Sequence, residues 1–388
     1  MKSSAFFSVG FRPFFASGIF FGALAILIWA GFWVPQLQLS FDQVMNPVGG
    51  FYFWHPHELI MGFSQAIIIG FLLTAARNWT GLETTTPLTL GIIWLTWLWA
   101  RFVMAFGEGY SINLIVLSQI LPPLLAAASI ASPIIRKRMW RNLFAPITLL
   151  MLALFDMALL HQQHESHTQP SQLFYAVMYM LMFLVAMIAG RIIPFFTANK
   201  LGIEKWIEPK LLLLTSVVPL LLLMPIQAIS DHTVRSYLTS GLAAVLLISH
   251  GIRLYKWHHK HIWQHPMLWS LWVSYALMLI GFILLCVQPI FNFGSVALHI
   301  FALGSISGLI VSMVSRVSLG HTGRTIVHDR VIIAAILCML IAALIRTLAI
   351  AVFGFSVGLI ITSALFASIS LALLFARFVV IWITPRSN

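Results

Sequence analysis

The sequence predicts an all-α membrane protein with twelve transmembrane helices and with both termini in the cytoplasm. Of its 388 residues, 60% are hydrophobic and only 8% are charged, whereas a soluble domain carries roughly 25% charged residues. Apolar segments of about 20 residues, the length that crosses a bilayer, fill nearly the whole chain. No polar stretch is long enough for a separate soluble domain, so we expect one transmembrane domain, residues 1–388.

The expected helices follow one another with only short polar or small-residue connections. The first continues to Trp33 without the small-residue cleavage site of a signal peptide, so we expect it to be retained. His55 and His57 open the second, and His161 closes the fifth. Only Phe353, Gly354 and neighbouring small residues separate the last two. The expected spans are 12–33, 57–77, 88–106, 112–134, 142–161, 171–197, 210–229, 235–256, 267–288, 295–317, 330–352 and 355–381.

The positions of lysine and arginine predict the orientation. With the N-terminus inside, 19 of the 22 Lys and Arg fall in cytoplasmic segments and 3 in outer loops, as expected for a protein that obeys the positive-inside rule. This distribution also explains the net charge of +12 without a nucleic-acid partner. Segments 11–15 and 191–196 resemble each other weakly, which is compatible with an origin from two halves.

Histidines near the outer face are candidate ligands, because an ionisable residue at membrane depth is a functional candidate. The topology places His55, His57, His161 and His299 near that face, where they would converge on one site. Imidazole binds transition metals and haem iron. His57 and Met61 share a helical face that suits copper(I), and His299 is the preferred haem ligand. The alternatives are a polar helix start for the first pair and an interhelical hydrogen bond for His299.

Other histidines are expected in polar connections. His164 and His167 follow His161 at intervals of three, but the intervening Gln and Glu residues favour a hydrated loop. The histidines of 258–265 lie in a basic segment that we expect at the cytoplasmic interface. Cys286 and Cys338 lie inside predicted spans, so we expect no disulfide and no covalent haem attachment.

Charged residues within the outer third of the spans are Arg101, Asp156 and Arg346. Intramembrane charges usually have a partner, so we expect them to pair with one another or, for the arginines, to neutralise haem propionates. Snorkelling to the interface is the alternative for both arginines.

A second polar cluster is expected at the inner face, after the second, sixth and tenth helices. It would form an anion or proton entry site, or provide only helix capping and turns. Its members are Asn78, Trp79, Arg191, Asn199, His321 and Arg324.

Several longer motifs contain these residues. They are Gly10-Phe-Arg-Pro-Phe-Phe15, Trp54-His-Pro-His-Glu58, Gly70-Phe-Leu-Leu-Thr74, Asn78-Trp-Thr-Gly81, Gly190-Arg-Ile-Ile-Pro-Phe-Phe-Thr197 and Ser318-Leu-Gly-His-Thr-Gly-Arg324. With them the chain resembles, nearly end to end, the NnrS family of haem- and copper-containing bacterial inner-membrane proteins. The resemblance implies twelve helices, copper, non-covalent b-type haem and protection against nitric oxide. Arg77 and Pro56 depart from the family pattern without removing a candidate ligand.

Three functions are compatible with these features. The first is a haem and copper redox protein, or oxidoreductase, that binds, senses or converts nitric oxide near the outer face; catalysis would need an open coordination position on the haem. The second is a haem- or metal-handling protein without turnover. The third is a secondary transporter, for which glycines and prolines such as Gly190 and Pro219 would supply broken helices. The expected partners are membrane lipids and nitric oxide, with no nucleic acid.

Overall fold

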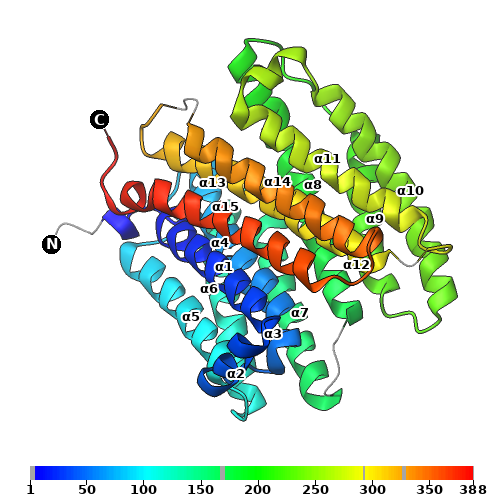
Figure 1. Cartoon of the computed structure of the whole chain (residues 1–388). Coiled ribbons are helices and arrows are strands. Elements are labelled where there is room, and N and C mark those ends of the chain that lie inside the picture. The colour runs from blue at the N-terminus through cyan, green and yellow to red at the C-terminus, as the bar shows by residue number, and fades with distance from the viewer. Residues whose placement is uncertain (1–4, 167–170, 292, 326–328, 388) are drawn as a thin grey trace. The chain divides into compact units, whose positions relative to one another are not determined.

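The structure, a computed structural model, describes residues 5–166, 171–291, 293–325 and 329–387. Two π-helical segments, Glu58–Ser64 and Ile300–Ser307, join α3 to α4 and α12 to α13. The helices are α1 (Phe11–Phe32), α2 (Pro35–Val44), α3 (Gly50–His57), α4 (Gln65–Thr80), α5 (Pro87–Phe106), α6 (Ile112–Arg136), α7 (Phe144–Ser166), α8 (Ser171–Leu201), α9 (Lys210–Ile226), α10 (His232–Trp257), α11 (Pro266–Cys286), α12 (Gly294–His299), α13 (Gly308–His321), α14 (Arg330–Ala351) and α15 (Val357–Ile383) (Figure 1).

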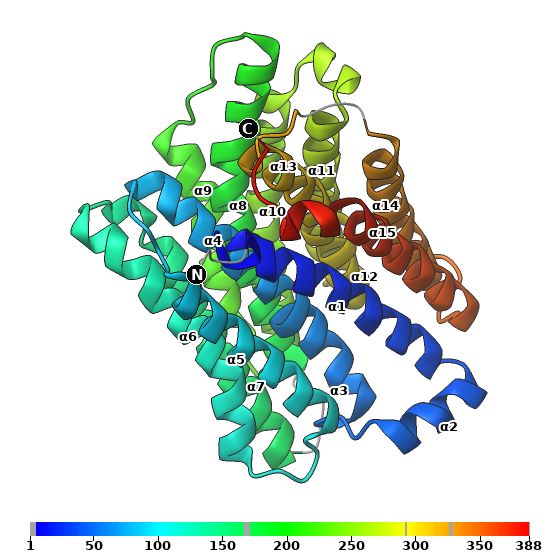
Figure 2. The ribbon, with the colours of Figure 1, turned by 90° about the vertical axis from the view of Figure 1, so that its left-hand side faces the viewer.

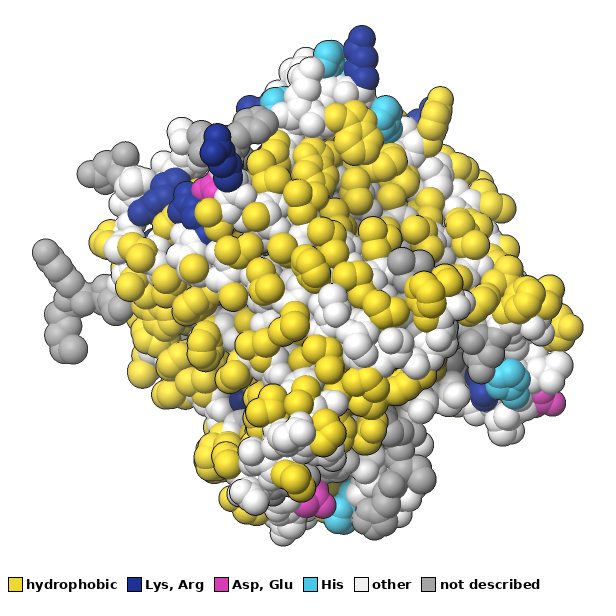
Figure 3. Space-filling view, in the orientation of Figure 1, with side chains coloured by type: hydrophobic (Ala, Val, Ile, Leu, Met, Phe, Trp, Pro, Cys, Tyr) yellow, Lys and Arg dark blue, Asp and Glu magenta, His cyan; other side chains and the backbone are white. Residues whose placement is uncertain are grey.

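The predicted fold class, an all-α polytopic membrane protein, is confirmed. Within the described residues, 11 helical stretches are long and apolar enough to cross a membrane, and α9 is a shorter apolar helix. With 17 residues α9 lies at the lower limit of about 17–25 residues for a span, so the count of twelve stays a prediction, as does the orientation. Hydrophobic side chains cover most of the face shown in Figure 3, as expected for a protein in lipid.

Three local predictions differ from the structure. The second span begins at Gly50 rather than 57, because Pro56 lies inside α3 instead of at its boundary. The fifth continues to Ser166, so the loop predicted for 162–166 is wrong; His164 is exposed on the helix, and His167 lies outside the described residues. Helix α2, with Pro35 at its first position, was not expected.

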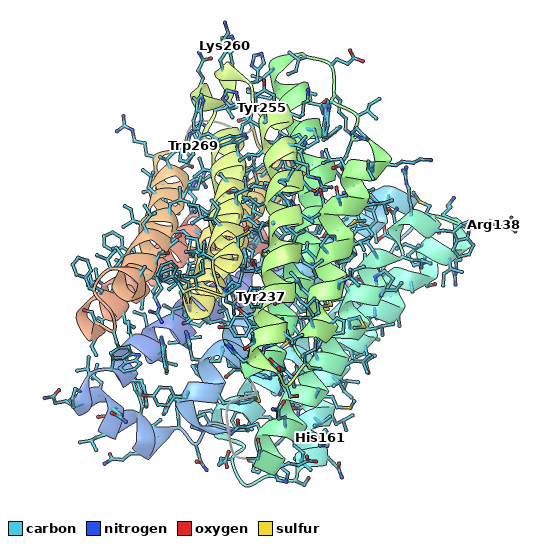
Figure 4. The ribbon with its side chains drawn as sticks, turned by 90° about the vertical axis from the view of Figure 1, so that its right-hand side faces the viewer. Arg138, His161, Tyr237, Tyr255, Lys260 and Trp269 are labelled. Carbon is cyan, nitrogen blue, oxygen red and sulfur yellow. The ribbon has the colours of Figure 1, made fainter. Side chains whose placement is uncertain are left out.

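The chain forms two compact units. Unit 1 comprises residues 1–170, 317–326 and 371–388, and unit 2 comprises residues 171–316 and 327–370. In unit 1, helices α1, α4, α5 and α6 run side by side (Figures 1 and 2). In unit 2, helices α8 to α11 do so (Figure 4). The prediction of a single domain stays a prediction.

Close packing of α1 against α4 positions the interior of unit 1. A Cβ on Gly10 would lie 2.6 Å from Cβ of Leu73, and one on Gly70 would lie 2.8 Å from Cβ of Phe14. The backbone N–H of Phe11 donates to Oγ1 of Thr74 over 3.0 Å. The glycines therefore let the two helices approach closely, which accounts for two of the motifs as packing features.

Candidate functional site

His57 lies where α3 meets the first π-helical segment, and its side chain is fully buried inside unit 1. Nδ1 is 2.9 Å from Oε1 of Glu58, and Nε2 is 2.7 Å from Oδ1 of Asp156 on α7. An ionised carboxylate accepts hydrogen bonds but cannot donate them. The geometry therefore fits an imidazolium held between two carboxylates.

Arg101 on α5 extends this network. Nη1 donates to Oε1 of Glu58, and Nη2 donates to Oε1 of Gln119 on α6 over 2.5 Å. The amide nitrogen of Gln119 donates to the carbonyl of Ala100 over 3.0 Å. Two cations and two anions make the network neutral overall, which lowers the cost of holding charges inside a membrane protein. Arg101 is paired and buried, so it does not snorkel.

Gly62 provides the space for the guanidinium. A Cβ at this position would lie 2.7 Å from Nη1 of Arg101 and 3.1 Å from Oε2 of Glu58. The carbonyl of Gly62 accepts a hydrogen bond from Nε1 of Trp97 over 3.1 Å. The π-helical segment that contains Gly62 is a rare geometry that occurs frequently at functional sites.

The network also has unused hydrogen-bonding capacity. Oε2 of Glu58, Oδ2 of Asp156 and Nε of Arg101 are buried without a hydrogen-bond partner in the described part of the protein. Buried polar atoms in proteins are normally satisfied, often by ordered water. These atoms could therefore bind water or another small polar ligand.

The other outer-face candidates of unit 1 are His55, Met61 and His161. The ring of His55 stacks on Trp29, with centroids 4.2 Å apart and planes at 11°. Met61 is fully buried in the π-helical segment, and His161 is half-buried near the end of α7. Among the described residues, no group of three or more His, Cys, Asp or Glu is placed to hold a metal ion.

In unit 2, His299 ends α12 directly before the second π-helical segment. Nδ1 donates to the carbonyl of Ser295 over 2.7 Å, and Nε2 has no hydrogen-bond partner among the described residues. Helix α12 packs against α14, which carries Arg346. Nη1 of Arg346 is buried without a hydrogen bond. A histidine with one free nitrogen and an unpaired cation thus lie on two helices that pack together.

The small residues after His299 allow close packing against α11. A Cβ on Gly304 would lie 2.9 Å from Leu277, and one on Gly308 would lie 2.4 Å from the hydroxyl of Ser274. Both of these partners are on α11, which fills the space above the glycines.

The predicted inner-face residues are divided between the two units. In unit 1, Nδ2 of Asn78 lies 3.4 Å from Nε2 of His321. Arg324 donates to the carbonyl of Thr322 over 3.4 Å, and Trp79 packs near Phe144. Arg191 is half-buried and Asn199 exposed, both on α8 of unit 2.

The Ser318–Arg324 motif anchors the C-terminal segment. Oγ of Ser318 accepts from Nε1 of Trp382 over 2.8 Å, and the Thr322 carbonyl accepts from the Ser387 backbone N–H over 3.0 Å. Arg12 donates to the carbonyl of Trp382 over 3.1 Å. Capping and chain anchoring thus account for these contacts.

Sequence reasoning missed a second buried polar cluster, in unit 2. Nε2 of the fully buried His250 lies 3.0 Å from the Ser216 carbonyl, and Nδ1 lies 2.5 Å from the Tyr275 hydroxyl. Arg253 donates to that hydroxyl over 3.3 Å and forms a two-point ion pair with Glu208. The signal was the close spacing of His250 and Arg253 within a predicted membrane span.

The helices and their buried charge networks define a multi-pass α-helical membrane protein with histidine–arginine sites in its interior. The NnrS protein family matches residues 5–386. The chain therefore belongs to the NnrS family. No match was found among the curated proteins.

Proposed function

We propose that the protein binds haem and copper in the bacterial inner membrane and acts in nitric oxide metabolism or protection against nitrosative stress. Nitric oxide would be bound or converted near the outer face. Membership of the NnrS family supports both cofactors and this role. Ionisable residues held inside the helical units support a function beyond membrane anchoring.

The hydrogen bonding of the His299 ring is the observation that carries the haem part of the proposal. Because Nδ1 donates to the Ser295 carbonyl, the lone pair of the neutral ring is on Nε2, so His299 could hold a haem iron through this nitrogen. Arg346 would neutralise a haem propionate. When bound, the haem iron would supply nitric oxide binding and redox chemistry.

The residues of unit 1 do not fit copper in the arrangement described. Both ring nitrogens of His57 already have carboxylate partners, and a copper ion there would have to displace Glu58 or Asp156. Copper itself therefore rests on the family, and its assignment to His55, His57, His161, Met61 or His299 rests on the predicted topology.

Absorption spectra and metal analysis of the purified protein, before and after exposure to nitric oxide, test the proposal. We expect a haem spectrum that changes with nitric oxide and that is lost in His299→Ala, because the iron loses its axial ligand. His258→Ala, at the end of α10 in the same unit, is the matched control and should keep it. A colourless, metal-free wild-type protein would refute the proposed function, and a haem spectrum unchanged in His299→Ala would refute this ligand.

A further inference from the structure

Equivalent helix ends recur three times along the chain. Gly81, Gly202 and Gly323 follow α4, α8 and α13, have φ of 67°, 65° and 74° and are evenly spaced in the sequence. Such left-handed positions after a helix favour glycine. These glycines indicate three repeats of four spans, α1 to α6, α7 to α10 and α11 to α15, with α2 as an extra element. In agreement with this division, the first helix of each repeat has a proline in its first turn: Pro13, Pro146 and Pro266.

The weak likeness between 11–15 and 191–196 does not belong to this repeat. Pro13 lies in the first span of the first repeat, whereas Pro194 lies in the second span of the second. An origin from two halves is therefore not supported by these segments.

The repeats place a histidine and an arginine in the same register twice. His57 precedes Gly81 by as many residues as His299 precedes Gly323, and each directly precedes a π-helical segment. Arg101 and Arg346 likewise lie equally far before two glycines in the left-handed region, Gly109 with φ of 90° and Gly354 with φ of 67°. The first and third repeats thus carry equivalent His–Arg pairs.

The two pairs differ in their counter-charge. In the first repeat Glu58 lies between His57 and Arg101 and contacts both. The equivalent residue of the third repeat is Ile300, which is 1% exposed. Arg346 forms no ion pair with the described residues, and its buried Nη1 has no hydrogen bond. The third repeat therefore has the imidazole and the cation without the carboxylate.

We propose that Arg346 binds the carboxylate of an external ligand, which takes the role that Glu58 has beside Arg101 in the first repeat. A guanidinium pairs strongly with a planar carboxylate through charge-assisted hydrogen bonds. A cation inside a membrane protein requires such a counter-charge. The carboxylate comes from a haem propionate or from a small free acid; the first source rests on the proposed function, and the second does not.

Two titrations of the haem-free, full-length protein in detergent separate the sources. Formate is titrated calorimetrically at constant ionic strength, and haem b is compared with its dimethyl ester by absorbance. We expect saturable formate binding, or tighter binding of haem than of the ester. Arg346→Gln should weaken formate binding by at least about tenfold, because the charged partner is lost. Where haem binds more tightly than its ester, the ratio of the two affinities should fall by the same factor. Arg330→Gln, exposed at the start of α14, should change neither.

Ile300→Glu provides a test that keeps the arginine. The new carboxylate should pair with Arg346 and weaken binding of the external carboxylate by at least about tenfold. The proposed site is refuted if the wild type shows neither formate binding nor a preference for haem over its ester. It is also refuted if Arg346→Gln binds formate, or prefers haem, as the wild type does. If haem and its ester both fail to bind while formate binds, the haem proposal fails and the carboxylate site stands.

Discussion

At the scale of single residues, the network around His57 depends on Gly62, because a glycine has no side chain to occupy the space. Gly62 leaves room for Nη1 of Arg101, which a Cβ would approach to 2.7 Å. The contact of Nη1 with Glu58 uses this space. The glycine therefore determines whether the arginine can reach the buried Glu58.

We expect Gly62→Ala to lower thermal stability in detergent. The methyl group would displace a buried guanidinium and separate Glu58 from one of its two cations, and breaking a buried ion pair costs about 3 kcal/mol or more. Gly241→Ala is the control, because a Cβ there meets nothing within 4 Å, and alanine favours a helix interior. Equal melting temperatures for Gly62→Ala and the wild type would show that the network adapts to the methyl group.

The sequence predicted the ionisable members of this site better than the neutral ones. His57, Arg101 and Asp156 were identifiable because charges are rare within apolar spans. Gln119 was not, since a neutral amide in an apolar helix has no distinctive sequence pattern and its partner depends on how α5 and α6 pack. His55 was predicted to share a site with His57. Residues two positions apart on a helix point in different directions, however, and the ring of His55 stacks on Trp29.

At the scale of helices, buried polar groups join α9, α10 and α11 in unit 2. The Tyr275 hydroxyl lies between Nδ1 of His250 and Nη1 of Arg253, while Nε2 of His250 reaches the Ser216 carbonyl on α9. A Cβ on Gly190 of α8 would lie 3.2 Å from the Arg253 guanidinium. The glycine of the 190–197 motif thus makes space for this cluster.

We expect Tyr275→Phe to destabilise the protein by about 1–3 kcal/mol, because a buried nitrogen of His250 and a hydrogen bond of Arg253 lose their partner. Tyr237→Phe is the control, since that side chain is 65% exposed on α10. Thermal unfolding of both variants in the same detergent checks this prediction. A loss no larger than that of the control would mean that water replaces the hydroxyl.

Hydropathy predicted the helices because bilayer-spanning segments must be long and apolar, and eleven of the expected spans coincide with membrane-length helices. Polar exceptions were harder to place. His55 and His57 were expected to open the second span, yet α3 begins at Gly50. The π-helical segments have no pattern that hydropathy detects, since their residues are as apolar as those of an α-helix.

At the scale of the whole molecule, the distribution of positive charge predicts which ends of the helices face the cytoplasm. Figure 4 shows Arg138 and His161 at opposite ends of unit 1. Arg138 belongs to the most basic connection, which the positive-inside rule assigns to the cytoplasm. His161 should then lie toward the outer face.

Cysteine labelling in spheroplasts checks this orientation after Cys286 and Cys338 are replaced by alanine. We expect an impermeant thiol reagent to label Glu165→Cys, beside the outer end of α7, and to leave Arg138→Cys unlabelled until the membrane is broken. The opposite pattern would invert the topology and would place every candidate outer-face ligand on the cytoplasmic side.

The π-helical segment after His57 has a consequence for insertion and deletion of residues. An α-helix turns by about 100° per residue, and a π-helical i→i+5 turn holds one residue more than an α-helical turn. If 58–64 became a regular α-helix without losing a residue, His57 would rotate by about 100° relative to Gln65, and the imidazole would face away from Asp156 although every side chain of the network was retained. Deleting one residue within 59–61 would compensate for this rotation. The wide turn thus sets the direction of the histidine independently of the helix that follows.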